Sequence, residues 1–203
     1  MLRNLIYAIL LGVGMAACLA DRDKNPPEAE VTGEEAAMTG SPEEDAPDPA
    51  AFTIAKGRVG DIRVGMPVTE MRTQVPQHFI LTDTLLHLEG QAYTAYRLRE
   101  EGSSTGLLIE QKCETDCQVW RIRVSSPSYK TAAGVGAGAT FSQVRQHYSI
   151  NFLGLSEAGL VAVAEQDGIS FVLDNAALPR EKLSRLKPAD IPANTPVKQI
   201  FIY

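Results

Sequence analysis

Hydrophobic positions between residues 51 and 203 recur with two spacings, one typical of helices and one typical of strands. Val68 with Met71, and Phe141 with Val144, have the i, i+3 spacing of a single helix face. Later runs are short and either alternate with polar residues or are continuously apolar, as strands are. Such strands are expected at 94–99, 106–111, 119–125, 160–165, 169–173 and 198–203. One polar side in the alternating runs predicts antiparallel strands with one solvated face.

The two expected helices begin in the same way. A glycine, Gly65 or Gly138, is followed by bulky apolar and polar residues in matching order, at 65–72 and 138–145. Thr140 and Gln143 have the spacing of a capping box, and Pro67 suits a first helical position. Gln166-Asp167-Gly168 is typical of a hairpin turn. The pattern predicts an α+β fold in which short helices pack on antiparallel sheet, as a pseudo-repeat of a helix plus three strands over about 58–127 and 131–203.

The first residues have the pattern of an export signal. Arg3 precedes an apolar run from Leu5 to Ala17, which is too short to span a bilayer comfortably and is typical of a signal peptide. The run ends in Met15-Ala16-Ala17-Cys18, which resembles the lipobox of bacterial lipoproteins, although leucine is more usual at the place of Met15. The resemblance implies that residues 1–17 are removed and that Cys18 carries lipid, including a palmitate-like acyl chain. Simple secretion with cleavage near Ala20, or an uncleaved anchor, are the alternatives.

The charge is unevenly distributed along the chain. Residues 21–50 contain ten acidic and two basic residues, whereas residues 51–203 contain fifteen acidic and sixteen basic residues. With few bulky apolar residues, the acidic stretch predicts a disordered tether over 18–50 that precedes one globular domain over 51–203. The nearly neutral domain argues against nucleic acid as a partner. An acidic tail that binds a cationic partner is the alternative reading of the tether.

Cys113 and Cys117 are separated by three residues between two expected strands. In an oxidising envelope this spacing favours a disulfide that closes a turn. A redox pair would prefer two intervening residues at a helix start, and a zinc site would need further ligands. Both remain as alternatives to the structural disulfide.

Four arginines alternate along two of the expected strands, at Arg97, Arg99, Arg121 and Arg123. If the strands are neighbours, these side chains share one sheet face and could receive an anionic envelope molecule. The alternative is a solvated face on which they pair with Glu100, Glu101 and Glu110. The aromatic residues Tyr93, Tyr96 and Trp120 suit either a binding surface or a small core.

Other reactive residue types do not form a recognisable active site. The histidines His78, His87 and His147 lack metal-binding spacing and are expected at the surface. Ser125 and Ser126 lack the glycine-flanked context of a nucleophilic serine. The stretch 134–138 is rich in glycine but lacks the phosphate-loop ending, so a turn is expected there. No catalytic residue, metal site or cofactor is therefore predicted.

The glycine-apolar helix start at Gly65-Met66, followed by three strands, resembles the small lipoproteins of the outer-membrane β-barrel assembly machinery, the BamE type. The resemblance covers about 60–125 and, more faintly, 133–203. An uncharacterised family of predicted lipoproteins is a second resemblance. Modules similar to the BamE type serve several functions, including inhibitor binding, and a shared fold does not transfer function.

Together these patterns predict a membrane-anchored lipoprotein of the cell envelope. It would face the periplasm or the cell exterior, with the outer membrane favoured in a Gram-negative bacterium because Leu19, not aspartate, follows Cys18. Its expected role is non-enzymatic binding of another envelope protein through a sheet face or edge. A module that binds an anionic ligand through the arginines is the first alternative, and a hydrolase or redox enzyme is the second. The helix pattern also predicts that Val68, Met71, Phe141 and Val144 are buried.

Overall fold

The structure is a computed structural model, and it describes residues 49–203. All of them belong to one compact unit, residues 44–203. The expected signal peptide over 1–17, the lipidation site Cys18 and nearly all of the expected tether lie outside the described residues. Within 49–203, every helix is too short or too polar to cross a membrane.

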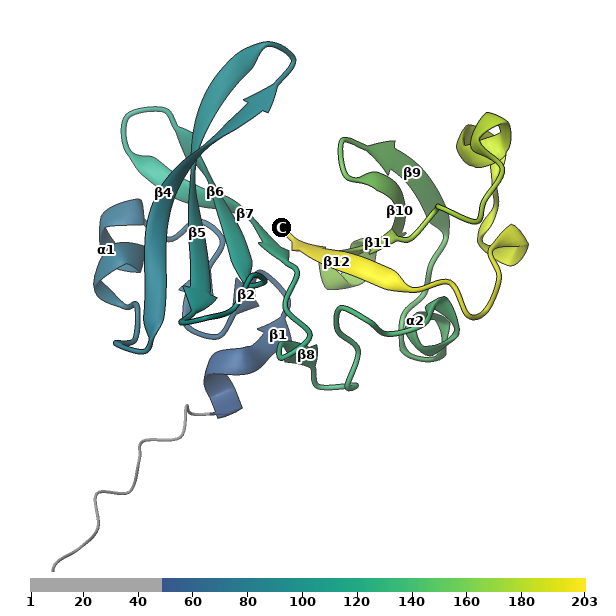
Figure 1. Cartoon of the computed structure of the whole chain (residues 1–203), viewed down its shortest axis with the longest axis horizontal. Coiled ribbons are helices and arrows are strands. Elements are labelled where there is room, and N and C mark those ends of the chain that lie inside the picture. Colours follow the sequence, from purple (N-terminus) through teal and green to yellow (C-terminus); the bar gives the residue numbers. More distant parts are fainter. Residues whose placement is uncertain (1–48) are drawn as a thin grey trace, which may run out of the picture. The chain divides into compact units, whose positions relative to one another are not determined.

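An eight-stranded antiparallel sheet forms most of the domain (Figure 1). Its strands lie in the order β4-β5-β6-β7-β12-β11-β10-β9, so β7 and β12 are central and β4 and β9 are the two edges. The bounds are β4 (Phe79–Leu88), β5 (Gln91–Glu100), β6 (Leu107–Cys113), β7 (Cys117–Val124), β9 (Phe152–Ser156), β10 (Gly159–Ala164), β11 (Ile169–Leu173) and β12 (Val197–Ile202).

A second, smaller sheet has the order β3-β2-β1-β8. Its strands are β1 (Thr53–Ala55), β2 (Arg58–Val59), β3 (Ile62–Arg63) and β8 (Lys130–Thr131), and β8 runs parallel to β1. Two short α-helices, α1 (Val68–Thr73) and α2 (Phe141–His147), precede β4 and β9 in the chain. The remaining helical turns are η1 (Pro49–Phe52), η2 (Glu165–Asp167), η3 (Arg180–Arg185) and η4 (Pro188–Asp190).

The predicted fold class is wrong. The described domain is mostly β, and its long strands form one continuous sheet instead of repeated helix plus three-strand units. The six expected strands exist, but the sequence pattern does not predict β4 and β9 of the main sheet, nor the short strands of the smaller sheet. Both β4 and β9 are edge strands with mixed exposure, and β4 places Leu85 directly before Leu86, which breaks the alternation on which the prediction relied. Pairing of β12 with β7 then joins the strands that follow α1 to those that follow α2.

The local predictions at the helix starts are confirmed except for the place of Pro67, which is wrong by one position. Gly65 and Gly138 have φ values of 82° and 85°, in the left-handed region that favours glycine. The Thr140 hydroxyl accepts a hydrogen bond from the Gln143 amide, and the Gln143 side chain accepts one from the Thr140 amide. Pro67 occupies the N-cap of α1 instead of the first helical position. The 166–168 turn does connect β10 to β11, through η2 and Gly168.

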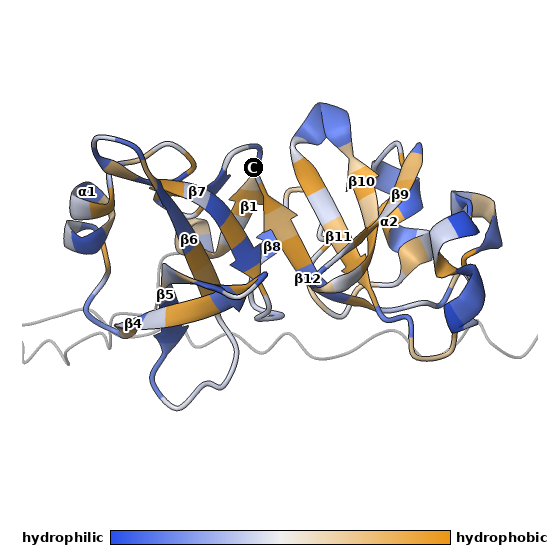
Figure 2. Ribbon diagram, turned by 90° about the horizontal axis from the view of Figure 1, so that it is seen from above, coloured by the Kyte–Doolittle hydropathy of each residue, from blue (hydrophilic) through white to orange (hydrophobic). Residues whose placement is uncertain are grey.

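The main core lies on one face of the eight-stranded sheet, called here the core face. The predicted helix residues Val68, Met71, Phe141 and Val144 are buried in this core, as expected. They pack with apolar side chains from the central strands, including Ile122 of β7. Figure 2 shows hydrophobic residues concentrated along β10, β11 and β12 and polar residues on α1. A smaller cluster, formed by Val161, Val172 and Phe201, covers the opposite face.

Truncation of the α2 core residue tests this packing. Phe141 is fully buried, so we expect Phe141→Ala to lower the free energy of unfolding by about 3–5 kcal/mol. Phe152, which is 62% exposed, provides the matched control, and Phe152→Ala should change stability little. Urea unfolding of both variants measures the difference. Equal losses would contradict this assignment of the core.

Candidate functional site

A cluster of four charged side chains, three buried and one partly exposed, lies on the sheet face opposite the core. We call it the ion cluster, and its members are Glu110 of β6, Arg121 and Arg123 of β7, and Glu157 of the turn between β9 and β10. The sheet face that carries it is called the arginine face. Glu110, Arg121 and Arg123 are only 4%, 7% and 9% exposed. The face predicted to be solvated is therefore covered at this point.

Glu110 lies between the two arginines. Its carboxylate accepts two hydrogen bonds from Arg121, at 3.0 Å from Nε and 2.7 Å from Nη2, and a further one from Arg123 Nε. Register places Glu110 directly opposite Arg121 on the neighbouring strand. This two-point contact is the strongest geometry for a carboxylate and a guanidinium, so β6 and β7 are tied together by charge as well as by the backbone.

Glu157 reaches the cluster from a distant part of the sheet. Its Oε1 accepts from Arg121 Nη2 at 2.8 Å and from Arg123 Nη2 at 2.6 Å. In the sheet β10 is separated from β7 by β11 and β12, so the β9–β10 turn meets β7 only because the sheet curls over the arginine face. With two arginines and two glutamates, the ion cluster is electrically neutral.

The arginines are also stacked on aromatic rings. The guanidinium carbon of Arg121 lies 4.8 Å from the ring centre of Trp120 and 4.9 Å from that of Phe201, and that of Arg123 lies 5.1 Å from the Phe201 ring. Aromatic faces attract cations and fill the space around the flat guanidinium groups. Phe201, on the neighbouring strand β12, therefore packs its ring against both guanidinium groups.

The surroundings of the cluster favour the charged forms. Burial alone would lower the pKa of Arg121, but the hydrogen bond and charge of Glu110, with the charge of Glu157, raise it above its ordinary value. Burial alone would raise the pKa of Glu157, but a backbone hydrogen bond and the charges of Arg121 and Arg123 lower it. Arg121 and Glu157 therefore remain ionised at neutral pH.

Trp120 protrudes from β7 because that strand changes neighbours at this residue. Residues 122–124 pair with β12, whereas Val119 exchanges hydrogen bonds with Gly65 and Met66, at 2.7 and 2.8 Å. The β6–β7 register shifts at the same place and leaves Trp120 without an opposite residue. Such a bulge changes the direction of a side chain, and the Trp120 ring is 46% exposed.

A trough of about 860 Å³ lies beside the ion cluster. The pairing of β5 with β6 ends at Ala95 and Glu110, beyond which the β4–β5 and β6–β7 hairpins separate. The trough occupies this separation. Its walls carry Leu86, Leu88, Ala92, Tyr93, Thr94, Lys112, Cys113 and Trp120, with Glu110 and Glu157 at one end. Its size and mixed apolar and polar lining are typical of ligand and peptide sites.

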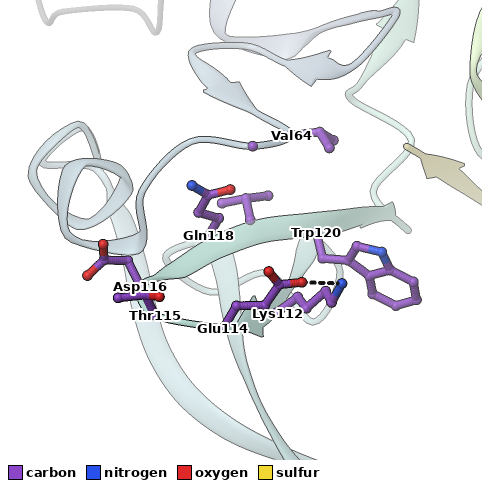
Figure 3. A pocket seen from close by; sticks show the side chains of 9 residues that line it. Val64, Lys112, Glu114, Thr115, Asp116, Gln118 and Trp120 are labelled. Atoms are coloured by element: carbon purple, nitrogen blue, oxygen red, sulfur yellow. Dashed lines mark ion pairs between the residues drawn. The ribbon is translucent and has the colours of Figure 1, made fainter.

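A smaller depression of about 410 Å³ lies on the other side of Trp120, between the β6–β7 hairpin and Val64 (Figure 3). On its rim the Lys112 ammonium contacts the Glu114 carboxylate at 2.9 Å, the ion pair drawn in Figure 3. This pair is exposed and lowers the pKa of Glu114 through the hydrogen bond and charge of Lys112. An exposed pair of this kind stabilises the fold little.

The four predicted arginines do not act as one open cationic surface. Arg97 is exposed and lies across from Leu108, which in turn lies across from Arg123. Arg99 is half-buried and donates to the Ser103 carbonyl at 3.0 Å. Arg121 and Arg123 are engaged by carboxylates. Glu110 was foreseen as a partner, but Glu157, 36 positions from Arg121, gives no local signal in the sequence.

Cys113 and Cys117 form a disulfide that closes the β6–β7 hairpin. The structural prediction for this pair is therefore confirmed. A loop this short stabilises the fold by about 2 kcal/mol in the chain-entropy description. Cys113 lines the trough, and the disulfide holds together the hairpin that carries Trp120.

The other candidate residues are either exposed or take part in hydrogen bonds of loops and turns. His78, His87 and His147 are exposed, on three different elements or loops. Ser125 exchanges hydrogen bonds with Gly106, and Ser126 accepts one from the Ser128 amide. The glycine-rich stretch over 134–138 forms a turn that the Thr131 hydroxyl closes by accepting from the Val135 amide.

Comparisons with known proteins bear on the fold alone. No protein-family model matches the chain, and no curated protein matches it. A solved structure described as the uncharacterized protein yfeY from Escherichia coli is similar, with a TM-score of 0.53 and 16% sequence identity. The match covers 74% of this chain and 97% of that protein. The similarity shows a shared arrangement of strands.

Removal of the central carboxylate should destabilise the domain strongly. In a Glu110→Gln variant two buried arginines share only Glu157, and loss of one partner of a buried ion pair costs about 3–5 kcal/mol. Glu114→Gln, on the same hairpin but exposed, should have no measurable effect. Urea unfolding followed by fluorescence of Trp120, the single tryptophan, measures both. A Glu110→Gln variant as stable as the wild type would disprove the role of the cluster.

Glu157 should make folding stability sensitive to acid. Its pKa is lower in the folded chain than its ordinary value of 4.5, so its contribution is complete above 4.5 and is lost as pH falls through the folded pKa. We expect Glu157→Gln to reduce stability at pH 7 and to converge with the wild type at low pH. The exposed Glu165→Gln variant is the control. Parallel stability curves for wild type and Glu157→Gln across this range would contradict the prediction.

Proposed function

We propose that the chain is a membrane-anchored lipoprotein of the cell envelope whose domain binds another envelope protein without catalysing a reaction. The observation that carries the binding proposal is the trough between the β4–β5 and β6–β7 hairpins. Two exposed aromatic rings, Tyr93 and Trp120, lie along a neutral and fully paired ion cluster. Rings held in this way are typical anchors of protein interfaces.

Contacts that orient the two exposed rings support a role in recognition. Trp120 is stacked on Arg121, whose guanidinium is bonded to both glutamates of the ion cluster. The Tyr93 hydroxyl donates to the Gln91 side chain at 2.9 Å, which orients the second ring. A surface that is ordered before binding loses less entropy when a partner arrives.

The lipoprotein part of the proposal is supported by the sequence. The apolar run that ends in Cys18 resembles a lipobox, and the acidic stretch that follows suits a spacer between membrane and domain. A disulfide in the domain is in keeping with an oxidising compartment. A lipid on Cys18 would restrict the trough to partners within reach of one membrane surface.

Cross-linking in intact cells, followed by mass spectrometry, tests the proposal. The full chain should capture a discrete envelope protein, and Trp120→Ala should reduce that capture by about tenfold or more, since loss of an aromatic anchor costs about 2 kcal/mol. Phe152→Ala removes a ring that is more exposed than Trp120, at 62% against 46%, but lies on the β9 edge, so capture should persist.

A Cys18→Ala variant separates binding from anchoring. The Cys18→Ala chain should leave the membrane fraction and no longer capture the partner in cells. In vitro, the purified wild-type and Trp120→Ala chains should still differ in their binding to that partner. Identical captured proteins in the wild-type and Trp120→Ala samples would contradict binding through the trough. Membrane retention and acylation of Cys18→Ala would contradict lipidation at Cys18.

A further inference from the structure

The outer half of the β4–β5 hairpin extends beyond the rest of the main sheet. All ten residues of β4 pair with β5, but β5 pairs with β6 only from Ala95 to Leu98. The part from Leu85 to Thr94 is therefore a two-stranded ribbon without a third strand in the described domain, and Figure 1 shows it projecting from the sheet. Two-stranded ribbons are marginally stable alone, so added pairing would stabilise this one.

The free side of the ribbon is β4, the last strand at this edge of the sheet. Soluble proteins usually protect a long edge strand with lysine, proline or a bulge. β4 contains no lysine, arginine or proline, and its ten pairs with β5 run without a register shift. Asp83 is its single acidic residue and is already bonded to Arg72 of α1, at 2.6 and 2.7 Å. Leu85 is 59% exposed on this edge.

The sequence of β4 is complementary to itself. When two antiparallel copies meet with Leu85 opposite Leu85, Asp83 of each copy lies opposite His87 of the other. Thr84 then faces Leu86, and Thr82 faces Leu88, so the remaining pairs combine β-branched and apolar residues, which suit cross-strand contact. A carboxylate bonded to one arginine can still accept from an imidazole. Centring on Leu86 instead would place Asp83 opposite Glu89, two like charges.

We propose that two copies of this chain associate through β4, in an antiparallel pair centred on Leu85, to form a sheet that continues across both copies. The charge pattern favours a second copy because the pairing is symmetric and contains no facing like charges. This association uses the edge of the ribbon, whereas the proposed envelope partner uses the trough. If the experiments show no pairing through β4, binding of the envelope partner in the trough can still be tested, and the reverse also holds.

Cysteine cross-linking of the full chain in cell membranes tests the pairing. Opposed residues of antiparallel strands have Cβ atoms about 4.5–5.5 Å apart, close enough for a disulfide to form with small adjustment. Leu85→Cys should give a disulfide-linked homodimer on mild oxidation. Leu155→Cys is the matched control, because Leu155 is a leucine of similar exposure (56%) on the opposite edge strand, β9. It should give only the background seen for the chain without an added cysteine.

A charge variant provides an independent measurement. Leu85→Lys places two lysines opposite each other and should convert the detergent-purified chain to monomer in analytical ultracentrifugation, while Leu155→Lys should remain dimeric. Both positions are exposed, so both variants should fold. A monomeric wild-type chain, or equal cross-linking from Leu85→Cys and Leu155→Cys, would overturn the proposal. Cross-linking of Leu85→Cys to a different protein would also overturn it, because the added strand would then come from a partner.

Discussion

The arrangement of the arginine face depends on the ion cluster. Arg121 and Arg123 lie on a central strand whose other face is already buried in the main core, so β7 is covered on both sides. Burial of two guanidinium groups is unfavourable unless each is paired, and Glu110 and Glu157 together satisfy both. Because Glu157 belongs to the β9–β10 turn, the same contacts hold that turn across the sheet against β7. We infer that this local requirement of charge helps to hold the curvature of the sheet.

The trough follows from this constraint and from the end of β5–β6 pairing. Where the β4–β5 and β6–β7 hairpins separate, the bulge at Trp120 turns an aromatic ring toward the opening, and Arg121 holds that ring in place. The disulfide between Cys113 and Cys117 closes the hairpin that carries it. The result is a surface with exposed apolar rings on a neutral, well-bonded base, which suits recognition of another protein more than capture of a free anion.

Local features were predictable from the sequence, and long-range ones were not. The capping box at Thr140, the short disulfide and the buried residues Met71 and Phe141 depend on neighbours a few positions away, and all were foreseen. The edge strands β4 and β9, which the pattern does not predict, have one side without a partner among residues 49–203, so their exposure does not follow a simple alternation. The burial of Arg121 depends on Glu157, which the topology of the sheet brings near. The predicted α+β repeat is wrong because the pairing of β7 with β12 is also nonlocal.

Hydrogen exchange of the full chain, compared between wild type and Glu157→Gln and read by mass spectrometry, tests the central claim most directly. If the ion cluster holds the β9–β10 turn on β7, the variant should exchange faster in the turn and in the segment around Trp120. Exchange in α1 and in the small sheet formed by β1, β2, β3 and β8 should stay unchanged. Unchanged exchange at the turn and at Trp120 would show that the curvature of the sheet does not depend on the cluster and would contradict this account.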